Sequence, residues 1–249
     1  MKVYNIVQTI VFTAITFIAT ALLVIETPAT GGYFNLGEAA IYVIAFLATP
    51  TATAVAAGLG PALADLVLGY WYFAPATFVI KFCEGLIVAT LIRKLKTGTR
   101  YSMVVRMLTV AMGIILALTI LVNSMPSGEE ATYASLTWTS TSILGLAVPV
   151  PTFVISLPSY TWIAVATLIL AISVVMALIR RPYVLAMALG GLTMVLGYFL
   201  YEYFISNPLI LGRDPVGAIF EVPVNVGQFT AGVLLATPVV QFIERATKG

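Results

Sequence analysis

Lys81 and Glu84 stand three residues apart in the stretch 74–86, which is otherwise suited to lipid. Residues at this spacing share one face of a helix, so the ammonium and the carboxylate can pair. A charged side chain inside a spanning helix costs about 3 kcal/mol, and such residues face the interior of a bundle and mark functional sites by default. The pair therefore indicates a polar binding site within a membrane protein, with a structural ion pair as the alternative.

Other polar residues fall at the same depth of the predicted membrane region. Glu221, Asn225 and Gln228 are spaced i, i+4, i+7, which puts them on one face of a helix. Such a face must turn into the bundle, because lipid would leave its polar groups unsatisfied. The residues predicted to orient a substrate by hydrogen bonds are Glu38, Asp65, Lys81, Glu84, Glu202, Glu221, Asn225 and Gln228.

Aromatic side chains crowd the same level, and we predict ring contacts from Trp71, Tyr72 and Tyr198. The alternative for Trp71 and Tyr72 is an aromatic belt at the membrane interface. A pocket with ring faces and a few fixed polar groups suits a small heterocyclic ligand. Acids outnumber lysine five to one in this layer, which favours a donor-rich or cationic ligand over a polyanion. Hydroxymethylpyrimidine, pyridoxine-like and thiamine-related molecules fit this description, and riboflavin is a further candidate.

Composition places the chain in the membrane. Hydrophobic residues make up 61% and charged residues 9% of the 249 positions, whereas a soluble domain carries about 25% charged residues. The single cysteine, Cys83, excludes an intrachain disulfide, and the absence of histidine removes the commonest transition-metal ligand. No Walker-type loop is present, so hydrolysis of ATP by that route is not expected of this chain.

The elements that must position these residues are membrane-spanning helices. Apolar segments of about 20 residues, as a bilayer requires, are predicted at 4–25, 75–93, 102–122, 161–179, 183–205 and 217–243. The stretch 39–69 is predicted to cross twice, with a turn at 49–51. Only then do the basic clusters at 93–100 and 180–181 lie in the cytoplasm, as basic residues normally do. The fold class is thus an all-α bundle of eight helices with both termini cytoplasmic.

The remaining segment, 123–160, is predicted to be an external loop whose part 143–158 forms an interfacial or lid-like segment. A ladder of small residues, Ala52, Ala56 and Gly60, lies at the spacing that lets helices approach closely. It indicates either packing within the bundle or docking of a partner membrane protein.

Several motifs together resemble the S components of energy-coupling factor (ECF) vitamin transporters. They are Gly-Tyr-Phe-Asn-Leu-Gly-Glu-Ala at 32–39, the segments 58–70 and 74–85, Gly-Tyr-Phe at 197–199, and Glu-Val-Pro-Val-Asn-Val-Gly-Gln at 221–228. The resemblance covers about 1–97 and 183–249. It adds Asn35, from the first motif, to the predicted substrate-binding residues.

The resemblance implies a multi-pass subunit of the plasma membrane that captures a vitamin from outside. It implies as partners a transmembrane coupling protein, docked on Ala52, Ala56 and Gly60, and two ABC-type ATPases, which would use ATP while this chain binds no cofactor. The family's six helices would come from 1–98 and 183–249. Residues 99–182 would then be an inserted helix pair within one membrane domain.

Two other classes of protein compete with this interpretation. A secondary transporter driven by an ion gradient would also use buried carboxylates, but its transport would not depend on ATP. An intramembrane enzyme is not expected. Glu129 and Glu130 resemble the acidic pair of some membrane proteases, yet they fall in the predicted external loop and no histidine accompanies them.

Overall fold

The computed structural model describes residues 3–27, 31–95, 99–124 and 160–247, together with four short strands between 134 and 157. Eight α-helices dominate it: α1 (Val3–Leu22), α2 (Gly37–Leu47), α3 (Pro50–Leu68), α4 (Ala74–Leu95), α5 (Thr99–Ser124), α6 (Tyr160–Leu178), α7 (Pro182–Tyr201) and α8 (Glu221–Ala246). A π-helix, η1 (Glu202–Leu211), continues α7, and a 3-10 helix, η2 (Pro215–Phe220), leads into α8. The prediction of an eight-helix bundle is confirmed.

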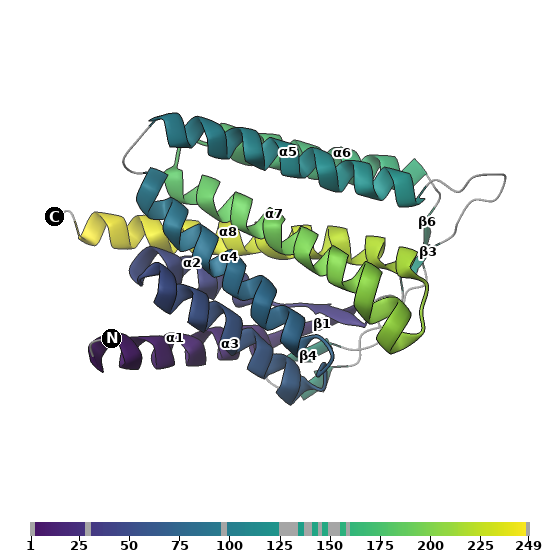
Figure 1. Cartoon of the computed structure of the whole chain (residues 1–249), viewed down its shortest axis with the longest axis horizontal. Helices are drawn as coiled ribbons and strands as arrows, with labels where there is room; N and C mark the ends of the chain where they lie inside the picture. Colours follow the sequence, from purple (N-terminus) through teal and green to yellow (C-terminus); the bar gives the residue numbers. More distant parts are fainter. Residues whose placement is uncertain are drawn as a thin grey trace.

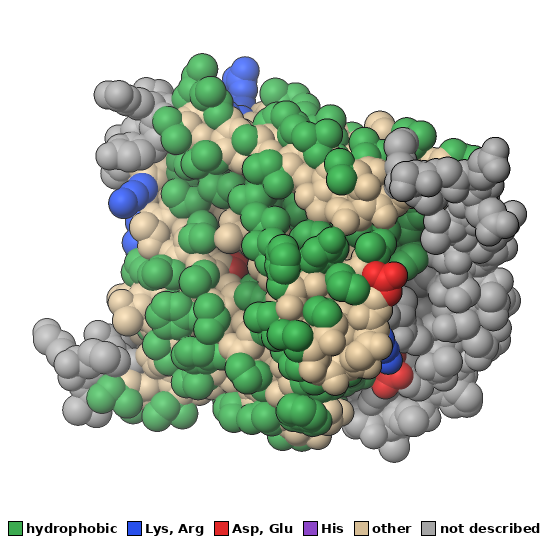
Figure 2. Space-filling view, turned by 45° about the vertical axis from the view of Figure 1, so that its right-hand side comes forward, with side chains coloured by type: hydrophobic (Ala, Val, Ile, Leu, Met, Phe, Trp, Pro, Cys, Tyr) green, Lys and Arg blue, Asp and Glu red, His purple; other side chains and the backbone are tan. Residues whose placement is uncertain are grey.

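Within the part of the chain that the structure describes, six helical segments are long and apolar enough to cross a membrane: α3, α4, most of α5, α6, α7 with η1, and η2 with α8. Helices α1 and α2 are shorter and also apolar. Much of the outer surface is correspondingly apolar (Figure 2). Large apolar side chains such as Ile10, Val67 and Phe242 are exposed on this surface, which suits contact with lipid better than contact with water. The chain is therefore a multi-pass membrane protein.

The stretch 39–69 forms two helices, as expected from its breakers. Thr49 begins α3 by accepting a hydrogen bond from the amide of Ala52, and Pro50 occupies the first turn, where its missing N–H costs nothing. Gly69 ends the helix in a left-handed conformation with φ of 92°, which glycine adopts without a steric penalty. Asp65 is thereby placed in the last turn of α3.

The helices form three groups (Figure 1). The hairpin of α5 and α6 packs on the side of α7, whereas α1 and α3 lie on the opposite side of the bundle. Between them, α2, α4, α7 and α8 enclose a core around Tyr42 and Phe229, both fully buried. The first and last helices point their chain ends to the same end of the bundle. We call this the terminal end, and the opposite one the sheet end.

Two small sheets occupy the sheet end, and these were not predicted. Strand β1 (Leu23–Thr27) pairs with β2 (Gly32–Phe34), and we call these two strands the strap. On its other edge β1 pairs with β4 (Thr141–Ile143), which pairs with β5 (Leu146–Val148). A second sheet joins β3 (Ala134–Leu136) to β6 (Ile155–Leu157). Helix 4–25 therefore ends earlier than expected, and described parts of 123–160 are hydrogen-bonded to the strap.

Candidate functional site

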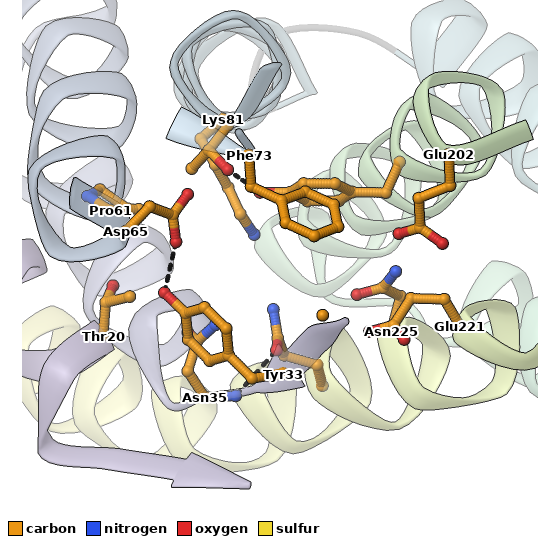
Figure 3. A pocket seen from close by; sticks show the side chains of 14 residues that line it. Thr20, Tyr33, Asn35, Pro61, Asp65, Phe73, Lys81, Glu202, Glu221 and Asn225 are labelled. Atoms are coloured by element: carbon orange, nitrogen blue, oxygen red, sulfur yellow. Dashed lines mark hydrogen bonds between the residues drawn. The ribbon is translucent and has the colours of Figure 1, made fainter. Parts of the chain in front are cut away.

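A cavity of about 390 Å³, including its opening, lies at the sheet end of the bundle (Figure 3). Its walls come from α1, β2, α3, α4, α7 with η1, and α8, so segments far apart in the sequence converge there. The described lining residues are Thr20, Gly32, Tyr33, Asn35, Pro61, Asp65, Phe73, Thr77, Lys81, Tyr198, Glu202, Glu221, Asn225 and Gln228.

Lys81 forms one end of the polar layer together with two carboxylates. Its ammonium bonds to Glu38 Oε1 and lies 3.3 Å from Glu84 Oε2. Tyr42 donates to Glu84 at 2.9 Å, and the Gln228 amide donates to Glu38 at 2.5 Å. All five side chains are almost completely buried. We call these five residues the Lys81 cluster. Each side chain takes part in at least one of these bonds, whereas the second carboxylate oxygen of Glu38, Oε2, has no hydrogen-bond partner.

The middle of the cavity is formed by hydroxyl groups and rings. Tyr33 donates to Asp65 at 2.5 Å, and Tyr198 donates to Thr77 at 3.0 Å. The ring of Tyr198 lies 5.6 Å from the Lys81 ammonium, within the range of a cation–π contact. Burial and the adjacent Asp65 raise the pKa of Tyr33, so its hydroxyl stays protonated and can donate. The carboxylate of Asp65 is thus held by the strap.

The strap is fixed to the helices by backbone and side-chain bonds. The amide of Asn35 donates to Gln228 Oε1 at 2.8 Å, and the Asn35 side chain accepts from the amide of Gly37 at 2.8 Å. The hydroxyl of Tyr70 donates a hydrogen bond to Glu26 at 3.0 Å. Burial raises the pKa of Tyr70, and the Glu26 carboxylate raises it further. These bonds tie one wall of the cavity to α2, α8 and the end of α3.

The other end of the polar layer contains Glu202 of η1 and Glu221 of α8. Figure 3 shows both side chains at one end of the cavity, with Asn225 beside them. Both carboxylates are buried, with 1% and 3% of their residue surface exposed. Glu202 Oε2 has no hydrogen-bond partner. We call these two residues the acid pair.

A glycine makes room for the acid pair. A Cβ atom added to Gly32 would lie 2.9 Å from Glu221 Oε1 and 3.0 Å from its carboxyl carbon. Real Cβ contacts essentially never come this close, so only glycine at this point of the strap leaves the Glu221 carboxylate in its present place.

The structure brings most of the predicted site residues together. Those that line the cavity are Asn35, Asp65, Lys81, Tyr198, Glu202, Glu221, Asn225 and Gln228. Glu38 and Glu84 lie behind Lys81 and hold it instead of lining the cavity. A role of Glu38 and Glu84 in substrate binding stays a prediction. In this structure such a role would be indirect, because the two carboxylates fix the position of Lys81.

Two predicted aromatic contacts need correction. Trp71 is 64% exposed and does not line the cavity. Tyr72 donates to the carbonyl of Gly31, which directly precedes β2, and its own carbonyl accepts a hydrogen bond from Tyr201 at the end of α7. Tyr72 therefore joins the start of β2 to α7. Both residues stand in the irregular turn after α3, where no helical periodicity fixes the direction of a side chain. Phe73, the next residue, lines the cavity instead.

Six residues that line the cavity were not among the predicted substrate-binding residues: Thr20, Gly32, Tyr33, Pro61, Phe73 and Thr77. Thr77 shares a helix face with Lys81 and Glu84, a signal that was available. Thr20 continues a row of threonines at 9, 13 and 16 along one side of α1. Small hydroxyl residues in an apolar helix are ordinary packing residues, and this row by itself does not point to a cavity.

The ladder of small residues lies inside the bundle. The carbonyl of Ala56 accepts a hydrogen bond from Thr16 at 2.8 Å, and a Cβ on Gly60 would lie 2.0 Å from the Thr16 hydroxyl. Ala52 is buried beside Ile44 and Ala48. These three residues therefore pack α3 against α1 and α2, in agreement with the packing alternative, and their docking to a partner protein stays a prediction.

Comparison with known proteins agrees with this architecture. The family model for the ECF-type riboflavin transporter S component matches residues 1–180, a range that includes α5 and α6. A curated protein of Pyrococcus woesei, described as an uncharacterized protein in gap 3'region, is 45% identical over 71 residues, 28% of this chain. The chain spans about half the length of that relative (47%). No solved structure matches.

The family match covers well over half of the chain, and it confirms the resemblance that the motifs indicated. The chain belongs to the ECF-type riboflavin transporter S component family.

Proposed function

We propose that this chain is the substrate-capture subunit of an ECF-type importer and binds a small water-soluble vitamin or vitamin precursor in the cavity at the sheet end. The observation that carries this proposal is the convergence of buried polar side chains from six parts of the fold on one cavity. Polar groups in a membrane bundle are costly, so their collection around one space is best explained by a ligand that uses them.

The orientation that we propose puts the sheet end outside the cell. Arg93 and Lys94 end α4, Arg180 and Arg181 precede α7, and Arg245 lies in the last turn of α8. All of these positions belong to the terminal end of the bundle (Figure 1). Basic residues favour the cytoplasmic side, so a cavity at the other end would receive a ligand from outside.

We further propose that a transmembrane coupling protein and two ABC-type ATPases complete the importer. The exposed surface between α1 and α3 is the contact area that we suggest for the coupling protein. Ile6, Ile10, Leu59, Leu63 and Val67 line an apolar groove there. Because its side chains are accessible, this groove is a better candidate for the docking surface than the buried ladder of small residues.

Riboflavin is the first molecule to test, since the family carries its name. Uptake of labelled riboflavin, thiamine and pyridoxine is measured in cells that produce this chain with ECF partner subunits. The proposal predicts uptake that stops when ATP is depleted and persists when an uncoupler removes ion gradients. The reverse pattern would instead establish a secondary transporter.

A further inference from the structure

We propose that the hairpin of α5 and α6 carries a binding site for an anionic phospholipid, such as phosphatidylglycerol, at the terminal end of the bundle. The phosphate group lies against Arg106, Arg180 and Arg181, and an acyl chain lies in the groove between the two helices. This site shares no residue with the lining of the cavity at the sheet end. It is therefore independent of which molecule the cavity captures.

The groove between α5 and α6 is apolar along its length and basic at one end. The residues that line it are Arg106, Met107, Val110, Ala111, Ile114, Val174, Ala177 and Leu178. From Arg106 to Ile114 the groove follows the axis of α5 for about 12 Å. Each half of the apolar core of a bilayer is about 15 Å thick, so the groove has the length and the direction that an acyl chain needs.

Arg106 stands at the end of this groove and bonds only to neutral acceptors among the described residues. Its guanidinium group donates to the carbonyl oxygens of Ala177 and Ile179 at the end of α6, and to the hydroxyl of Ser102 at 3.2 Å. These bonds use three of the five N–H donors of an arginine. The ion pairs of the described residues do not include Arg106, and its side chain is partly exposed. Its charge and its remaining donors can therefore bind a phosphate, which arginine does through paired hydrogen bonds.

Two further arginines lie beside the same end of the groove. Arg180 and Arg181 follow Ile179 directly in the chain, and both are exposed. Successive Cα atoms are about 3.8 Å apart, so both arginines start close to the carbonyl that Arg106 binds. Arg181 also precedes α7, whose first turn has no side-chain cap, and the free amide groups at the start of a helix attract an anion. Three arginines and the start of a helix are thus gathered at the end of the groove.

The distribution of charge favours an anionic lipid as the occupant. Neither α5 nor α6 contains an acidic residue, and Glu244 in the last turn of α8 is the one described acid at the terminal end. The cytoplasmic leaflet contains anionic lipids, and basic pockets between spanning helices on that side bind their headgroups. A free phosphate ion would use the arginines and leave the apolar groove unused. A phospholipid uses both, because it joins a phosphate to acyl chains.

Native mass spectrometry of the purified chain tests the lipid site. The chain in detergent is mixed with equal amounts of phosphatidylglycerol and phosphatidylcholine that have the same acyl chains, so that the two lipids differ in net charge. We expect the chain to retain at least tenfold more phosphatidylglycerol than phosphatidylcholine. Arg106 also holds the end of α6, so its replacement would change the fold and the site together. The variants therefore alter other residues, and thermal unfolding shows that each variant is folded.

Two variants separate the basic end from the groove. Arg180→Gln removes one positive charge near the headgroup, which should lower the preference for phosphatidylglycerol about fivefold. Arg245→Gln is the matched control, because Arg245 is an exposed base at the same end of the bundle but on α8; its preference should equal that of the unaltered chain. Ala111→Trp fills the groove without a change of charge, and retention of phosphatidylglycerol should fall at least fivefold.

Four results would overturn the lipid site. The unaltered chain could retain both lipids equally, or Arg245→Gln could lower the preference as much as Arg180→Gln, which would indicate a general effect of surface charge. Ala111→Trp could retain as much phosphatidylglycerol as the unaltered chain, which would exclude the groove. Finally, inorganic phosphate at millimolar concentration could displace the lipid, which would identify a site for free phosphate instead. Riboflavin uptake tests the capture function separately from all four.

Discussion

The two ends of one polar layer differ in how their carboxylates are held. In the Lys81 cluster, two acids surround one ammonium, and Tyr42 and Gln228 add hydrogen bonds from behind the cavity. At the acid pair, Glu202 lies beside a second acid, Glu221, instead of an ammonium (Figure 3). One oxygen of Glu202 has no hydrogen-bond partner, as is also true of Glu38 Oε2 in the cluster. Both ends are buried to a similar degree, so burial alone does not distinguish them.

This difference separates the buried charges that hold the scaffold together from those that a ligand can reach. A buried charge that has its partners can hold helices in place, whereas one without them is costly unless something else binds it. The Lys81 cluster joins α2, α4 and α8, and it presents only Lys81 and Gln228 to the cavity. The acid pair presents both of its carboxylates.

The largest expected effect comes from breaking the Lys81 cluster. Lys81→Ala leaves Glu38 and Glu84 buried without their cation, which should lower the free energy of unfolding by about 3–5 kcal/mol and abolish ligand binding. Thermal unfolding in detergent measures the first effect and calorimetry the second.

A second variant separates stability from binding. Adding Glu38→Gln and Glu84→Gln to Lys81→Ala removes the unpaired charges, so much of the lost thermal stability should return while binding stays absent. An unfolding temperature for Lys81→Ala equal to that of the unaltered chain would show that the cluster does not hold the scaffold.

A smaller effect is expected where the strap approaches the acid pair. Gly32→Ala places a Cβ atom against the Glu221 carboxylate, whose flexible side chain can move away. The fold should tolerate this change, with an unfolding temperature within a few degrees. Affinity for the ligand should fall about tenfold, a loss of about 1.4 kcal/mol. Gly227→Ala is the control, because a Cβ there meets no atom within 4 Å; equal affinities in the two variants would contradict the assignment.

The smallest effect is expected outside the layer. Trp71→Ala removes a large ring that is mostly exposed and does not line the cavity. Ligand affinity should therefore change by less than a factor of two in the same calorimetric measurement. A tenfold loss would restore Trp71 to the site and would show that the turn after α3 closes over the ligand.

The helices and the face of α8 could be predicted because length and periodicity determine them. The i, i+4, i+7 spacing of Glu221, Asn225 and Gln228 correctly predicts that these three side chains share one cavity. The start of α3 could also be predicted from local sequence, because Thr49 caps the helix and Pro50 occupies its first turn.

The strap could not be predicted in this way. Val24 and Ile25 are apolar and continue the pattern of α1, so they are expected to extend that helix, although β-branched residues also favour strands. Their strand conformation depends on pairing with β2 and with β4, more than 100 residues later. The same applies to Tyr33, whose contact with Asp65 follows from the position of the strap.

Mass spectrometry of the small molecules that the purified chain retains shows whether the cavity holds a vitamin-like ligand. Asn225→Phe, which should fill the cavity from α8, provides the comparison, with thermal unfolding to confirm its fold. We predict that the unaltered chain retains a small heterocyclic compound that the variant lacks. Retention of no small molecule by the unaltered chain after exposure to a vitamin mixture, or equal retention by both proteins, would contradict the account.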